Sequence, residues 1–120
     1  MVECGRKEKQ MIRETINQIN ATIQNAKSLD EKQKKELLDL VSTLNVEVLE
    51  LSKTHPEHTR SITDLTEMSI HEAIREEKNA QLLKSSLQRL STSVEGFEGS
   101  HPKLVGIVNS LCLALSNVGI

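Results

Sequence analysis

Residues Leu104-Val-Gly-Ile-Val-Asn-Ser-Leu-Cys-Leu-Ala-Leu-Ser-Asn-Val-Gly-Ile120 form a run of 17 without one charged side chain, and every Lys, Arg, Asp and Glu lies before it. Within this run, Leu104, Val108, Leu111 and Leu115 recur at intervals of four and three residues, which is the spacing of one helix face. The run predicts a helix over about residues 102–117, with Gly119 as its cap. Its apolar side needs a cover: the chain's own helices, a second copy, a partner protein or a membrane.

The composition indicates a single domain that spans residues 1–120. The chain has 37% hydrophobic residues, one Phe, and neither Trp nor Tyr. A core must therefore be built from Leu, Ile and Val. This composition is typical of a thin helical bundle, in which each helix buries one narrow side.

Two amphipathic segments open the chain. In the first, predicted as a helix over about residues 6–26, isoleucine repeats at positions 12, 16, 19 and 23, which is a narrow seam of the coiled-coil type. In the second, predicted over about 31–53, the stripe is wider. The short connection between them indicates an antiparallel hairpin. Either Ser28 with Glu31 or Asp30 with Gln33 fits the capping box at the start of the second helix.

Both prolines of the chain follow histidine, in Thr54-His55-Pro56 and in Ser100-His101-Pro102. Proline suits the first turn of a helix, so both motifs predict a break followed by a new helix. The 40 residues between the breaks carry a stripe of Leu83, Leu87 and Leu90. They predict one long helix over about 57–95, because no turn chemistry marks a break inside it. The alternative is two helices separated near residues 77–79.

These elements predict an all-α fold: an antiparallel helical hairpin, a long third helix and an apolar C-terminal helix, arranged as a bundle or like a coiled coil. The residues Phe97-Glu98, Ser100-His101-Pro102, Leu104 and Asn109, and the ending Ala114-Leu115-Ser116-Asn117-Val118-Gly119-Ile120, resemble the C-terminal signature of a family of small bacterial all-helical proteins catalogued as a domain of unknown function. His71-Glu72-Ala73 and Glu77-Lys78-Asn79 resemble the middle of its longer members. The resemblance covers about residues 11–120 and implies a bacterial, cytosolic helical protein without an assigned activity.

Charge and motifs argue against a nucleic-acid-binding protein and against an enzyme. The net charge is −2, and the basic residues alternate with acidic ones instead of forming a stripe. No glycine elbow surrounds a serine, and Cys112 has no basic neighbour in its helix that would activate its thiol. We therefore expect no catalytic residue, no cofactor-binding residue and no cofactor.

The histidines supply the alternative hypothesis, a metal-binding bundle. His55, His58 and His71 lie near carboxylates in the sequence, and imidazole and carboxylate are common metal ligands. However, di-iron bundles carry a Glu-x-x-His motif on each of two helices, and the spacing from Glu67 to His71 is one residue too long for that motif. The Cys and His spacings of zinc sites are absent. We expect His55 and His101 to be turn residues, and His58 and His71 to be solvated.

The sequence predicts a protein that acts by protein–protein interaction or self-assembly. We expect a homo-oligomer, or a complex with another helical protein, because the apolar stripes are wider than one hairpin covers. No spaced cysteine set and no apolar signal segment are found, so we expect a cytoplasmic location. Further alternatives are a peripheral membrane protein or a regulatory subunit that docks through residues 104–120. Insertion of this run into a membrane is disfavoured by its two Asn, two Ser and two Gly. The predicted core or interface residues are Ile12, Ile16, Ile19, Ile23, Leu83, Leu87, Leu90, Leu104, Val108, Leu111 and Leu115.

Overall fold

The computed structural model describes the backbone of residues 2–119 and the side chains of residues 9–119. Within this range all regular structure is helical, which confirms the predicted all-α bundle. Ile120, the last residue of the signature, lies outside the described residues. The elements are α1 (Val2–Asn25), α2 (Glu31–Leu51), α3 (Pro56–Ile74), α4 (Ala80–Ser93), the 3-10 turn η1 (Glu95–Phe97) and α5 (Pro102–Gly119).

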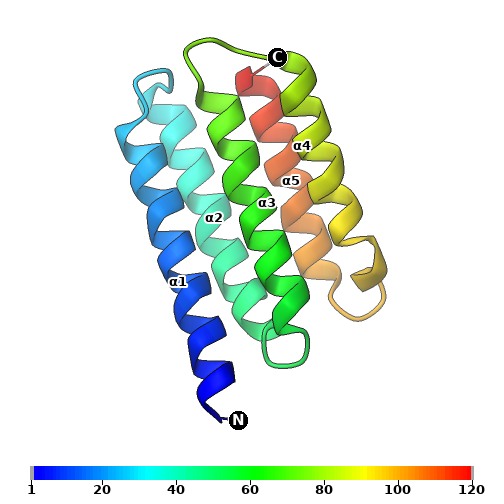
Figure 1. Cartoon of the computed structure of the whole chain (residues 1–120). Coiled ribbons are helices and arrows are strands. Elements are labelled where there is room, and N and C mark those ends of the chain that lie inside the picture. The colour runs from blue at the N-terminus through cyan, green and yellow to red at the C-terminus, as the bar shows by residue number, and fades with distance from the viewer. Residues whose placement is uncertain (1, 120) are drawn as a thin grey trace.

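Consecutive helices run in opposite directions, so α1, α3 and α5 begin at the same end of the bundle (Figure 1). The molecule measures 43 × 27 × 22 Å. α3 is the central element, because it contacts each of the other four α-helices. α5 packs against α2, α3 and α4, which leaves its remaining side facing outward.

The predicted hairpin of α1 and α2 is present, and the structure decides between its two possible caps. The backbone N–H of Gln33 donates to Asp30 Oδ1 at 2.7 Å, and Gln33 Oε1 accepts from the N–H of Asp30 at 3.0 Å. This reciprocal pair is a capping box. Ser28, the other candidate, instead donates its hydroxyl to the Ile74 carbonyl oxygen at 2.9 Å, which ties this loop to the end of α3.

The prediction of one helix over residues 57–95 is wrong. α3 ends at Ile74 and α4 begins at Ala80, so the alternative break near 77–79 was the better one. Asn79 provides the missing turn chemistry: its Oδ1 accepts from the backbone N–H of Leu82 at 3.0 Å and caps α4. Lys78 donates its ammonium to the carbonyl oxygens of Ala73 at 2.7 Å and Val118 at 3.2 Å, joining the C-terminal ends of α3 and α5.

Replacing Asn79 by Ala should lower the free energy of unfolding by about 1 kcal/mol, within a range of roughly 0.5–2 kcal/mol, because the Leu82 N–H loses its partner. Urea denaturation followed by circular dichroism at 222 nm measures this. Gln81→Ala is the matched control, since Gln81 is exposed in the first turn of the same helix. An equal effect of both substitutions would contradict the capping role of Asn79.

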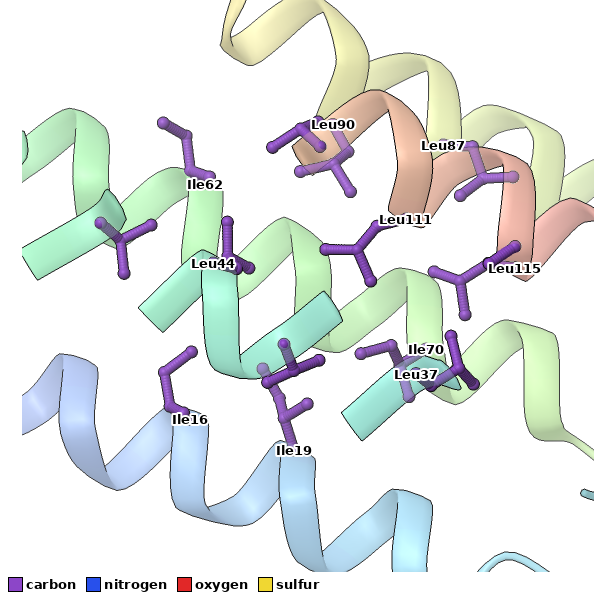
Figure 2. Packing of buried hydrophobic residues seen from close by; sticks show 14 of the residues in the cluster. Ile16, Ile19, Leu37, Leu44, Ile62, Ile70, Leu87, Leu90, Leu111 and Leu115 are labelled. Atoms are coloured by element: carbon purple, nitrogen blue, oxygen red, sulfur yellow. The ribbon is translucent and has the colours of Figure 1, made fainter. Parts of the chain in front are cut away.

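The core lies between the inward sides of all five helices (Figure 2). α3 contributes small polar side chains to it, and Thr59, Thr63 and Thr66 are at most 1% exposed. Each hydroxyl donates to the carbonyl oxygen four residues earlier in the chain, at 2.7 to 2.8 Å. Their hydrogen-bonding capacity is thereby met inside the helix, so burial of these residues costs little. Their small size lets the other helices approach α3 closely.

Gly119 does not act as the predicted glycine cap, because no described glycine has a positive φ. Its role is steric, because a larger residue would not fit at this position. A Cβ atom at this position would collide with Leu83 Cδ2 and would lie 3.2 Å from the Cα atom of Ala73. Gly119 therefore lets the end of α5 pack directly against the junction of α3 and α4.

Candidate functional site

The residues predicted as core or interface all lie inside the single chain. None of the eleven is more than 9% exposed, and all belong to one buried cluster. The five helices of one copy are therefore enough to cover the stripes, and the width of the stripes is no longer an argument for oligomerisation. The buried residues are Ile12, Ile16, Ile19, Ile23, Leu83, Leu87, Leu90, Leu104, Val108, Leu111 and Leu115.

The histidines divide between the two ends of α3. His55 is the N-cap residue of α3 and His58 lies in its first turn, whereas His71 lies in its last turn. His71 follows His55 by 16 residues, so the two lie about 24 Å apart along the axis of α3. The structure thus does not bring the three predicted candidates together.

A different set of rings meets where α3 and α5 begin. The ring of Phe97 makes edge-on contacts with His55, His58 and His101, with centroid distances of 5.3, 5.6 and 5.9 Å. His55 and His58 are themselves 5.8 Å apart. This arrangement, the histidine–Phe97 cluster, was missed in the sequence. The sequence does carry a signal for this cluster in the repeated hydroxyl–His–Pro motif. Each copy marks a helix start, and α3 and α5 begin at the same end of the bundle (Figure 1).

The two motifs are alike in detail. Thr54 Oγ1 lies 2.8 Å from Nδ1 of His55, and Ser100 Oγ lies 3.0 Å from Nδ1 of His101. Each hydroxyl therefore fixes the orientation of the imidazole that follows it.

The charges near this cluster act on Glu50. A hydrogen bond from Lys53 and the charge of Lys53 lower the pKa of Glu50, and the charge of His101 lowers it by a smaller amount. Phe97 is 8% exposed under these rings, so the cluster closes this end of the core.

The metal-binding alternative does not fit this geometry. Among the described residues, no group of three or more His, Cys, Asp or Glu side chains is arranged to hold a metal ion. The three imidazoles of the cluster surround a phenyl ring instead of an empty centre, and His71 is remote from them. His55, His58 and His101 therefore pack around Phe97 at this end of the bundle.

Cys112 does not have the surroundings of a catalytic thiol. It is partly buried, and its Sγ lies 3.8 Å from the carbonyl oxygen of Leu87. Burial raises the pKa of the Cys112 thiol above its ordinary value. Less thiolate is then present at neutral pH, which lowers the reactivity of the group.

The outward side of α5 is the most unusual surface of the bundle. Its exposed residues between the two ends of the uncharged run are Gly106, Asn109, Ser110, Leu113 and Asn117, which we call the α5 outer face. At 66%, Leu113 is the most exposed large hydrophobic side chain that the structure describes. Each of the other four α-helices presents charged side chains to solvent, whereas this face has none.

Comparison with known proteins adds one similarity. A family described as a domain of unknown function (DUF4404) matches residues 64–120. This part includes the second half of α3, all of α4 and α5, Phe97 and His101, and it omits His55 and His58. The resemblance predicted over residues 11–120 is supported over this shorter range. No curated protein and no solved structure matches the chain.

Proposed function

We propose that this chain acts by binding another protein through the α5 outer face and that it catalyses no reaction. The observation that carries the proposal is the exposed, uncharged surface around Leu113. The centres of protein interfaces are depleted of charged residues, because a charge loses its hydration there. A solvent-facing helix normally carries charges on its outer side, so their absence over five exposed positions is typical of a surface that a partner covers.

The character of this face favours a protein partner over a membrane. α5 is long and apolar enough to cross a membrane by length and composition alone, but the same holds for core helices of soluble proteins. Its apolar side fills the core through Leu104, Val108, Leu111 and Leu115, which are fully buried. Insertion would open that core. The α5 outer face offers Asn, Ser and Gly around a single Leu, and Lys103 at the start of the helix is the one cation of α5, whereas helices that bind anionic lipid surfaces are rich in Lys and Arg.

A capture experiment tests the proposal with Leu113→Glu as the interface variant. Tagged wild-type chain, Leu113→Glu and Val46→Glu are each incubated with lysate of the source cells, and retained proteins are quantified by mass spectrometry. Val46 is the matched control, because it is an apolar side chain 62% exposed on the outward side of α2. Circular dichroism checks that all three chains are folded.

We expect a partner that the wild type and Val46→Glu retain equally and that Leu113→Glu retains at least about tenfold less, as for an interface residue worth 1.4 kcal/mol or more. Equal retention by Leu113→Glu would overturn the proposal. A parallel flotation assay with anionic vesicles separates the membrane alternative: flotation that Leu113→Glu abolishes would favour a lipid surface instead.

A further inference from the structure

We propose that the partner of the α5 outer face is a second copy of this chain, bound with its α5 antiparallel to the first. This inference rests on the proposed function and assigns its partner. In the assembly, Leu113 of each copy sits over Gly106 of the other. The contact is two-fold symmetric, as is usual for homodimers, so the same face serves on both sides.

The two residues form a knob and a hole on one side of the helix. Leu113 projects into solvent, and Gly106 is exposed two turns before it. Nothing lies within 4 Å of the position that a Cβ atom of Gly106 would occupy, so the helix backbone is open to a side chain from outside. A leucine packed there would approach the backbone more closely than at any residue that bears a side chain.

Symmetry then selects the direction of the second helix. A two-fold axis midway between positions 106 and 113 passes between Asn109 and Ser110, and it places each leucine over a glycine. A parallel pair would instead oppose leucine to leucine and glycine to glycine. That arrangement leaves a gap at Gly106, which forfeits packing contacts. The antiparallel pair also opposes the two helix dipoles favourably.

The charges agree with this register. Lys103 is the only charged residue of α5, and it is exposed. In the antiparallel pair it lies opposite position 116 of the second copy, near the C-terminal carbonyl groups of that helix, which carry partial negative charge. Because the face between these ends is uncharged, pairing the two α5 helices opposes no like charges within them.

The area of the face sets the strength of the dimer. From Lys103 to Asn117 the helix extends about 21 Å, and a helix is about 10 Å wide, so the face offers roughly 200 Å² per copy. Stable dimers bury about 800 Å² per partner. We therefore expect a weak, reversible dimer.

Disulfide trapping tests the arrangement. In a Cys4→Ser and Cys112→Ser background, a single cysteine is introduced by Ser110→Cys or by Asn117→Cys, and covalent dimer is followed under mild oxidation. In the proposed register the two copies of position 110 are offset by about 1.5 Å along the helix, whereas those of position 117 are offset by about 22 Å. A disulfide needs Cα atoms within about 7 Å, so only the first pair is within reach.

We expect Ser110→Cys to form covalent dimer at least about tenfold faster than Asn117→Cys, and Leu113→Glu to abolish this difference. Sedimentation velocity between 10 µM and 1 mM should detect the same dimer for the background chain. Equal trapping at both positions would overturn the antiparallel register, and a monomer at 1 mM would overturn the second copy as partner. Neither result decides the proposed function, which is tested separately by the loss of captured protein on Leu113→Glu.

Discussion

Leu111→Ala should lower the free energy of unfolding by about 3–5 kcal/mol, whereas Leu113→Ala should change it by less than about 0.5 kcal/mol. The two leucines lie two residues apart in α5, yet Leu111 is fully buried and Leu113 is 66% exposed. Figure 2 shows Leu111 among the buried residues of the core. Its truncation leaves a cavity that the surrounding helices fill only partly, and truncation of Leu113 leaves none.

Urea denaturation followed by circular dichroism at 222 nm measures both values, since the chain has neither Trp nor Tyr to report by fluorescence. Similar losses for the two variants would contradict the orientation of α5, because they would require Leu113 to be buried as well. The result also decides which residue serves as an interface probe. A charged substitution at Leu111 would disrupt the core of the free chain, whereas one at Leu113 alters only its surface.

The second large effect is expected at Gly119. Gly119→Ala should destabilise the fold by about 1–3 kcal/mol, because the new methyl group collides with Leu83 and presses on the backbone of Ala73. The collision lies at the junction where Lys78 binds the carbonyl oxygens of Ala73 and Val118, so the end of α5 must shift to relieve it.

Gly106→Ala is the matched control in the same helix and should have the opposite sign. Nothing lies within 4 Å of its Cβ position, and alanine is favoured over glycine inside a helix by up to about 1 kcal/mol. Thermal and urea denaturation at low protein concentration measure both variants as monomers. A stabilising effect of Gly119→Ala would show that the junction of α3, α4 and α5 is looser than described.

The periodic apolar positions were sufficient to predict the helices at both ends of the chain. In α1 and α5 the burial of each stripe follows from the sequence, because a helix with one apolar side can only be stable with that side covered. The break between α3 and α4 was only the alternative prediction, behind one long helix. Asn79 caps α4 by a local bond to the Leu82 N–H, which is a sequence signal, whereas the bonds of Lys78 form only where the ends of α3 and α5 lie beside it.

The candidate sites were predicted less well than the fold. The spacing of the uncharged run placed Leu111 on the apolar stripe and left Leu113 off it, but it did not show that the side with Leu113 faces solvent. The histidines were grouped by distance along the chain, which paired His71 with residues about 24 Å away. The return of His101 to Phe97, beside His55 and His58, depends on α5 packing parallel to α3.

The sequence by itself determined the helical class, the apolar side of each terminal helix, and the places where proline starts a new one, because these follow from local spacing and backbone restriction. The tertiary structure alone decided that α3 is central, with buried threonines that bond to their own helix. It also decided that one copy of the chain covers its own stripes, and that α5 keeps an uncharged side in solvent. Burial depends on which helices become neighbours, and that choice is made by packing over long distances in the chain.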